Sequence, residues 1–315
     1  MTAAGSLSVP TVPLRLDVRK ALTTEPPSPD FVLPGLSTGT VGALVAPGAT
    51  GKTLLLLQVS AALAGGLPVL GGRFFSDARA APADPAKVVL VVAEETAPLM
   101  HLRLHAAVEA LLPKTRRDLF DPSHERLMAL LQENLHIYPL AGQFRMLLDG
   151  GDPQCDGLAV LNDISDGARL VAVDPLRQFH TGDENDSWVM TKLMQDLQRL
   201  ACTRDLAVIV AHHTNKWSTA NGQGDKAGAS RGSAAFTDAV RWQMNLSTLD
   251  TDLAKAHGIG IEDARQYVRL DLAKTNYLPP QSPLVLKRGA GGAFLPLAAP
   301  SRAAANRSPS ARGKP

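Results

Sequence analysis

The sequence has few cysteines, almost no net charge and no long apolar run. Its two cysteines, Cys155 and Cys202, form no CxxC pattern and provide no disulfide framework, which suits a reducing compartment. The formal net charge of +2 excludes a basic excess over the whole chain, so any nucleic-acid-binding surface must be local. No run reaches the roughly 18 apolar residues of a membrane span, and residues 1–20 lack the apolar core of a signal peptide. We therefore expect a soluble, cytoplasmic protein with no membrane partner.

The composition is that of a globular protein with a sizeable core. Hydrophobic residues make up 45% of the 315 residues and charged residues 20%. Residues 1–30 are rich in Pro, Ser and Thr, which predicts a flexible N-terminal arm. Residues 299–315 contain several arginines and no acidic residue, which predicts a disordered basic tail. We expect residues 31–298 to form the folded domain between them.

Apolar runs that alternate with amphipathic stretches predict an α/β fold. Continuous apolar runs at residues 40–46, 87–92, 169–174 and 206–213 are typical of strands buried on both faces of a parallel sheet. Residues 51–65 are apolar nearly all round, as in a helix packed on a sheet. A second helix is predicted at 186–205, capped by Asp186, with an apolar stripe of Val189, Leu193, Met194, Leu197, Leu200 and Ala201. This order predicts a mostly parallel central sheet flanked by helices.

A phosphate-binding loop is predicted between the first of these strands and the first helix. The consensus is G-x-x-x-x-G-K-[ST], and residues 46–53 read APGATGKT, with Ala46 in place of the first glycine. Glycines in the stretch Gly48, Ala49, Thr50, Gly51 permit the dihedrals that turn backbone N–H groups toward a phosphate. Lys52 would neutralise the β- and γ-oxygens, and the Thr53 hydroxyl would complete the coordination of Mg²⁺.

Carboxylates follow two of the predicted strands. Asp174 ends the strand at 169–174, where a metal-side carboxylate is needed beside the phosphates. Glu94 and Glu95 follow the strand at 87–92, and a glutamate there could deprotonate a water that attacks the γ-phosphate. Such a base favours nucleotide hydrolysis over phosphotransfer. Glu95 is the candidate for an acid that serves the dipole of the following helix instead.

Histidines end the strand at 206–213, and a polar stretch follows. His212 and His213 are adjacent, so they point to opposite faces of a strand and make a poor metal site. Residues 214–233 form a long polar stretch that includes Lys216, Trp217, Lys226 and Arg231. Basic and aromatic side chains of this kind suit a loop that binds single-stranded DNA, and a linker is the alternative.

Several segments beyond the phosphate loop are specific to one family. The chain resembles the RepA-type hexameric replicative DNA helicases of broad-host-range plasmids, within the RecA-like ATPase superfamily, in VDPLRQFH, AHHTNK, SRGSAAFTDAVRWQ and AKTNY. The resemblance extends from residue 29 to residue 280. It implies a RecA-like core and a homohexameric ring with ATP and Mg²⁺ at the subunit interfaces. It also implies that single-stranded DNA passes through the central channel.

The resemblance also implies roles for individual residues. Lys52, Thr53 and Asp174 would hold phosphate and Mg²⁺. Glu94 would be the catalytic carboxylate, and His213 would sense the γ-phosphate and link hydrolysis to the DNA loop.

Four further residues carry roles by the same resemblance. Arg241 would be the arginine finger offered to the ATP of a neighbouring subunit. Arg103 and Tyr277 would sandwich the adenine. Larger ring helicases carry a Lys-x-Arg finger where this chain has Lys274-Thr275-Asn276, which gives more weight to Arg241 and leaves Lys274 to touch the neighbour's γ-phosphate.

These observations predict an ATP-dependent DNA helicase of plasmid or mobile-element replication, which would work with the initiator and primase proteins of the same replicon. A RecA-like recombination or regulatory ATPase that binds DNA without unwinding it is the first alternative. A small-molecule P-loop kinase is the second, but the sequence shows no arginine-rich lid, and Glu94 argues against it.

Overall fold

The computed structural model describes residues 15–75, 84–112, 122–143, 157–213 and 234–297. The strands are β1 (Phe31–Leu33), β2 (Leu36–Ser37), β3 (Val41–Ala46), β4 (Val88–Val92), β5 (Leu135–Pro139), β6 (Leu170–Asp174), β7 (Ala207–His213), β8 (Trp242–Thr248), β9 (Tyr267–Thr275), β10 (Leu284–Arg288) and β11 (Phe294–Pro296). The α-helices are α1 (Val18–Thr23), α2 (Lys52–Ala64), α3 (Ala97–Leu111), α4 (Pro122–Asn134), α5 (Gly157–Ile164), α6 (Ser187–Arg204), α8 (Ala234–Ala239) and α9 (Thr251–Ala256).

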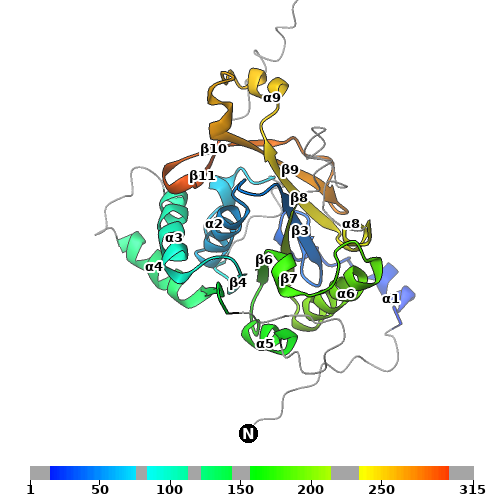
Figure 1. Cartoon of the computed structure of the whole chain (residues 1–315). Helices are drawn as coiled ribbons and strands as arrows, with labels where there is room; N and C mark the ends of the chain where they lie inside the picture. Colours follow the sequence, from blue (N-terminus) through cyan, green and yellow to red (C-terminus); the bar gives the residue numbers. More distant parts are fainter. Residues whose placement is uncertain (1–14, 76–83, 113–121, 144–156, 214–233, 298–315) are drawn as a thin grey trace, which may run out of the picture.

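A nine-stranded sheet with the order β11-β10-β9-β8-β3-β7-β6-β4-β5 forms the centre of the fold (Figure 1). The strands from β8 to β5 in this order run parallel to one another. The three strands β9, β10 and β11 are antiparallel to their neighbours. The prediction of a mostly parallel sheet is therefore confirmed. The antiparallel extension of the sheet was not predicted.

Helices cover both faces of this sheet, and its central strands β3, β4, β6 and β7 are buried on each side (Figure 1). Alternate residues of β7 belong to two separate cores, because successive side chains point to opposite faces. Ala207, Ile209 and Ala211 share one core with α2, α3 and α4, and Val208 and Val210 share the other with α5, α6 and α8. In α2 every residue except Thr53 is buried.

The predicted strands and the two predicted helices all form. The strands expected at 40–46, 87–92, 169–174 and 206–213 are β3, β4, β6 and β7, and the helices are α2 and α6. The Asp186 side chain accepts hydrogen bonds from the backbone N–H groups of Trp188 and Val189, so it caps α6 as predicted. One stripe residue was wrong: Val189 is half-buried, and Met190 occupies the core in its place.

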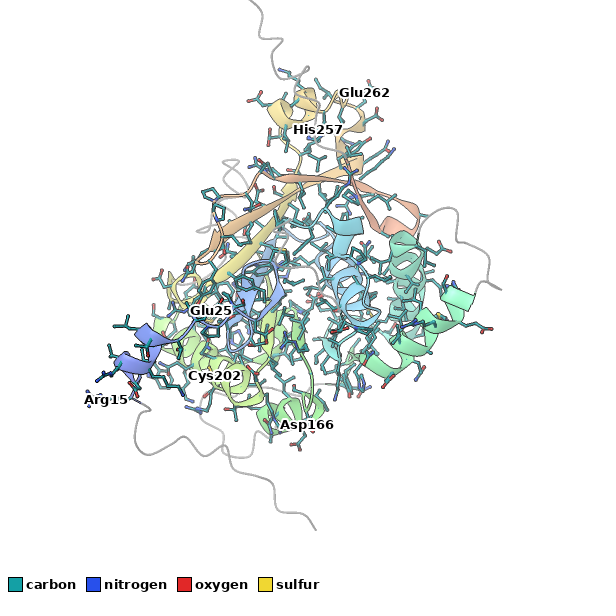
Figure 2. All side chains as sticks on the ribbon, turned by 180° about the vertical axis from the view of Figure 1, so that it is seen from behind. Arg15, Glu25, Asp166, Cys202, His257 and Glu262 are labelled. Atoms are coloured by element: carbon teal, nitrogen blue, oxygen red, sulfur yellow. The ribbon has the colours of Figure 1, made fainter. Side chains whose placement is uncertain are left out.

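Part of the segment predicted as a flexible arm is helical. Residues of α1 are all exposed, and Arg15 and Glu25 lie on either side of this helix (Figure 2). The Asp30 carboxylate receives both guanidinium N–H groups of Arg169 at 2.6 Å, which fastens the end of this segment to the start of β6. The predicted basic tail at 299–315 lies outside the described residues. Among the residues that the structure describes, no helix is long and apolar enough to cross a membrane.

Candidate nucleotide-binding site

The site lies at the carboxyl edge of the parallel strands. Because β3, β4, β6 and β7 run parallel, the segments that follow them meet at the same edge of the sheet. The phosphate loop follows β3, Glu94 follows β4, Asp174 ends β6 and His213 ends β7. The structure thus brings together the residues predicted for phosphate, metal and catalysis.

The phosphate loop has two residues in the left-handed region. Ala49 has a φ of 59°, and Gly51, which precedes α2, has a φ of 106°. The prediction that Gly48 needs such a dihedral was wrong, since Ala49 adopts it. A Cβ atom added at Gly48 would meet nothing within 4 Å, so this glycine faces open space at the mouth of the loop. The loop leads into the N-terminus of α2, where backbone N–H groups suit the binding of an anion.

Lys52 reaches back into the loop from the first turn of α2. Its Nζ donates to the carbonyl oxygens of Ala46 and Pro47, both at 3.2 Å, and lies 3.3 Å from Nδ1 of His213. The residue is buried, and this burial lowers the pKa of its ammonium, while the nearby carboxylates of Asp174 and Glu94 oppose the shift. Lys52 is thus placed where an anion in the loop would meet a positive charge.

Asp174 is a buried carboxylate with one unsatisfied oxygen. Its exposed fraction is 2%, and its Oδ2 has no hydrogen-bond partner among the described residues. Burial raises the pKa of Asp174 to about 6, and a hydrogen bond from the Thr53 side chain and the charge of Lys52 oppose the rise. A buried carboxylate with one unsatisfied oxygen, beside a hydroxyl, is a ligand set that suits Mg²⁺. Thr53 and Asp174 therefore fit the metal that a phosphate loop implies.

The two glutamates after β4 have different partners. Glu94 accepts a hydrogen bond at Oε1 from Nε2 of Gln178, at 3.2 Å. Glu95 forms an ion pair with Arg103 on α3, at 2.6 Å. Glu94 and Gln178 also line a cavity of about 280 Å³ with the segment from Leu140 to Gln143. Glu94 thus faces a cavity, whereas Glu95 is paired with a cation of the same chain.

His212 and His213 point to opposite faces of β7, as predicted. Burial lowers the pKa of His213, and the positive charge of Lys52 lowers it further, so the ring is neutral at pH 7. The His212 ring packs against Phe236, with centroids 4.4 Å apart, and its Nδ1 lies 3.7 Å from the Glu184 carboxylate. Within the described ranges, no group of three or more potential ligands could hold a metal by itself.

Three of the predicted residues lie at the opposite edge of the sheet, namely Arg241, Lys274 and Tyr277. Trp242 pairs with Gly42 near the start of β3, so the preceding Arg241 is far from the loop that follows the end of β3. Arg241 is exposed, and no ion pair of its guanidinium is found in the described part of the chain. The Lys274 Nζ donates to the carbonyl of Thr237 at 2.7 Å.

The predicted adenine pair is not assembled within one chain. Arg103 is held by Glu95 near the carboxyl edge. Tyr277 follows β9 at the amino edge, where its ring lies 5.9 Å from that of Phe31. Strand register separates the two residues, and neither the sequence motif nor its spacing could reveal this. The predicted DNA-binding residues Lys216, Lys226 and Arg231 lie outside the described residues.

A C-terminal hairpin that the sequence did not indicate contacts the phosphate loop. Nη2 of Arg288 in β10 donates to the carbonyl of Thr50 at 2.7 Å. The Arg288 guanidinium carbon lies 5.3 Å from the centre of the Phe294 ring in β11. The partners are 238 residues apart in the sequence, and no known motif surrounds Arg288. The hairpin also contacts α2, where Gln58 is hydrogen-bonded to the backbone of Phe294.

The chain matches one protein family, and its structure is similar to several solved structures. Residues 9–219, which are 211 of the 315 residues, match the family described as AAA domain. The solved structure of an ATPase domain superposes with a TM-score of 0.51 at 14% identity, over 83% of this chain and 86% of that chain. A DnaB-like replicative helicase, solved to describe its interactions with primase, has a TM-score of 0.53 at 15% identity. That superposition covers 82% of this chain and 57% of the helicase chain. The RadB recombinase has a TM-score of 0.47 at 16% identity, over 82% of this chain and 91% of that chain.

Proposed function

The chain belongs to the AAA domain family, and from this premise we propose that it is an ATP-dependent DNA helicase. In this proposal it acts as a homohexameric ring that moves along single-stranded DNA during plasmid or mobile-element replication. Its cofactors are ATP and Mg²⁺. Its partners are single-stranded DNA and the initiator and primase proteins of the same replicon.

One observation carries the proposal: the machinery for hydrolysis gathers at one edge of the sheet, and Arg241 is exposed at the other. An arginine finger acts on charge that develops at a γ-phosphate. Arg241 cannot reach the phosphate loop of its own chain, since Trp242 pairs at the start of β3 and the loop follows its end. A second copy of the chain can supply the missing arginine. A ring of identical subunits completes every such interface.

The residues at the carboxyl edge suit the hydrolysis of a γ-phosphate. Lys52 and the N–H groups of the loop would bind the phosphates, and Thr53 and Asp174 would hold Mg²⁺, which would supply positive charge to the phosphate oxygens. Glu94, held by Gln178, accepts a proton from the attacking water. Neutral His213, 3.3 Å from the Lys52 ammonium, is close enough to respond to the γ-phosphate.

The link to DNA is proposed from the position of the segment that follows His213. This histidine ends β7 beside Lys52, and residues 214–233 come directly after it in the chain. A change at the γ-phosphate therefore has a covalent path to Lys216, Lys226 and Arg231. Among the proteins of similar fold, the DnaB-like helicase was solved for its interactions with primase, which supports the choice of partner.

Strand displacement with a tailed duplex tests the proposal. The purified chain with ATP and Mg²⁺ should release the labelled strand, whereas the Lys52→Ala variant should not. ATP hydrolysis stimulated by single-stranded DNA without displacement would favour a recombination or regulatory ATPase. Phosphate transfer to a small molecule would favour a kinase. Negative-stain images should show six-fold rings, and their absence would contradict the ring.

A further inference from the structure

The hairpin formed by β10 and β11 lies against the phosphate loop. Arg288 donates from Nη2 to the carbonyl of Thr50, and its remaining N–H donors have no partner among the described residues. The guanidinium is half-buried, with the Phe294 ring 5.3 Å away. The planar guanidinium of Arg288 is thus held beside the loop by a carbonyl and an aromatic ring, and it keeps N–H donors that a ligand could use.

The fit between hairpin and loop is close. A Cβ atom at Gly51 would stand 2.8 Å from Cζ of Phe294 and 3.3 Å from Nη1 of Arg288. Gln58 of α2 fixes the hairpin in place, since its amide exchanges two hydrogen bonds with the backbone of Phe294, at 3.0 and 2.7 Å. The position of Arg288 relative to the loop is therefore set by several independent contacts.

The order of the strands places this hairpin on the flank opposite the catalytic residues. Next to β3 on one side come β7, β6 and β4, which carry His213, Asp174 and Glu94. On the other side come β8, β9, β10 and β11. A triphosphate whose γ-phosphate lay at the catalytic flank would have its nucleoside on the side away from that flank, where Arg288 lies.

We propose that Arg288 binds the nucleoside end of the nucleotide, with its guanidinium stacked on a purine base. This proposal rests on the proposed function, because it requires that the loop binds a nucleoside triphosphate. It gives the base a contact within the same chain, in which Arg103 and Tyr277 do not lie together as a pair. Guanidinium groups stack on aromatic faces, and Phe294 behind the side chain limits its motion.

Binding of two ligands that differ only in the nucleoside tests this role. The dissociation constants of a non-hydrolysable ATP analogue and of inorganic tripolyphosphate are measured by calorimetry with Mg²⁺. In Arg288→Ala the constant for the ATP analogue should rise about tenfold, since one cation–π contact is lost. The constant for tripolyphosphate should stay unchanged. The matched control is Lys287→Ala, because Lys287 lies over the Tyr267 ring instead, at 5.6 Å.

Further results of the same measurements distinguish binding of the nucleoside by Arg288 from a purely structural role of Arg288 at the loop. If both ligands weaken equally, or neither does, the proposal is wrong. Arg288→Gln keeps an N–H donor for the Thr50 carbonyl and loses the cationic plane, so it should weaken only the ATP analogue, even if Arg288→Ala fails to fold. If the wild-type chain binds tripolyphosphate but no ATP analogue, the nucleoside contact is refuted. If it binds neither ligand, the proposed function itself fails.

Discussion

The two edges of the central sheet differ in how complete they are. At the carboxyl edge, polar groups already contact one another: Lys52 meets His213, and Gln178 holds Glu94. At the amino edge, Arg241 is exposed and Tyr277 is 50% exposed. The polar groups of the carboxyl edge are thus organised within the chain, whereas Arg241 and Tyr277 at the amino edge remain accessible. Under the proposed function, their partner is the carboxyl edge of the next subunit.

Substitution of one essential residue at either edge should have the largest effect on ATP hydrolysis. Lys52→Ala removes the counter-charge of the γ-phosphate and should abolish ATP hydrolysis. Arg241→Ala should bind ATP yet lose activity on the order of 10³–10⁵-fold, because a finger stabilises charge only in the transition state. Steady-state ATPase assays with equal subunit concentrations measure both losses.

A mixture of these two variants tests whether the edges meet in trans. Interfaces that join the intact loop of one variant to the intact Arg241 of the other are complete, so mixed rings should regain activity that neither parent has. Verified mixed rings without any recovery would mean that Arg241 acts only within its own chain.

Removal of the proposed base should have the next largest effect. Glu94→Gln keeps the shape and the contact with Gln178 but cannot accept a proton, so turnover should fall by about 10²–10⁴-fold with ATP binding preserved. Single-turnover hydrolysis and nucleotide binding measure the two quantities. Glu95→Gln is the matched control, since Glu95 pairs with Arg103. Normal hydrolysis by Glu94→Gln together with loss in Glu95→Gln would reverse the assignment.

The buried charge of Asp174 should appear as a pH-dependent loss of stability. Its folded-state pKa of about 6 lies above the unfolded value of 3.8, so the folded state holds the proton more tightly. Stability from this group is present below pH 4 and is lost as the pH rises through 6, by about 3 kcal/mol. Asp174→Asn removes this loss. Without nucleotide, the variant should gain stability over the wild type as the pH rises from 4 to 7.

Denaturant unfolding at several pH values measures that gain. Asp166→Asn is the control, since this carboxylate is 77% exposed and should show no comparable trend. The Asp174 variant should also lose Mg²⁺-dependent ATPase activity. A constant stability difference across the pH range would contradict the buried charge.

The smallest expected effect is on the salt dependence of DNA binding, and it concerns residues 214–233, which follow β7 in the sequence. Alanine at Lys216, Lys226 and Arg231 should flatten the dependence of the logarithm of DNA affinity on the logarithm of salt concentration, by about 0.7 for each lost phosphate contact. Fluorescence anisotropy of labelled single-stranded DNA measures this slope. ATP affinity without DNA should not change, and unaltered DNA binding would make the segment a linker. The control replaces three exposed basic residues elsewhere, Lys20, Lys255 and Arg265.

The carboxyl edge could be predicted from the sequence because its signals are local. Each buried strand appears as a continuous apolar run, and the polar residue that ends the run marks the edge of the sheet. The motif ending in Lys52 and Thr53 identifies the loop directly. Parallel pairing then brings Asp174, Glu94 and His213 together without any further information.

The remaining features could not be predicted, because they depend on contacts between distant segments. Nothing near Gly51 in the sequence indicates that Phe294 will lie against it. The partner of Arg103 depends on the direction in which α3 leaves β4, and the position of Tyr277 depends on the register of β9. The loop dihedrals also differ from expectation, since Ala49 takes the left-handed conformation that glycine usually adopts.

The contact between Gln58 and Phe294 also decides how the sheet can meet other chains. β11 is the last strand on its side of the sheet, and an edge strand offers its free backbone groups to any extended polypeptide. The Gln58 amide carries the same donor and acceptor as a peptide unit, and it occupies both backbone groups of Phe294. A foreign strand therefore cannot add at this position. The helix side chain therefore protects this edge of the sheet against the addition of another strand.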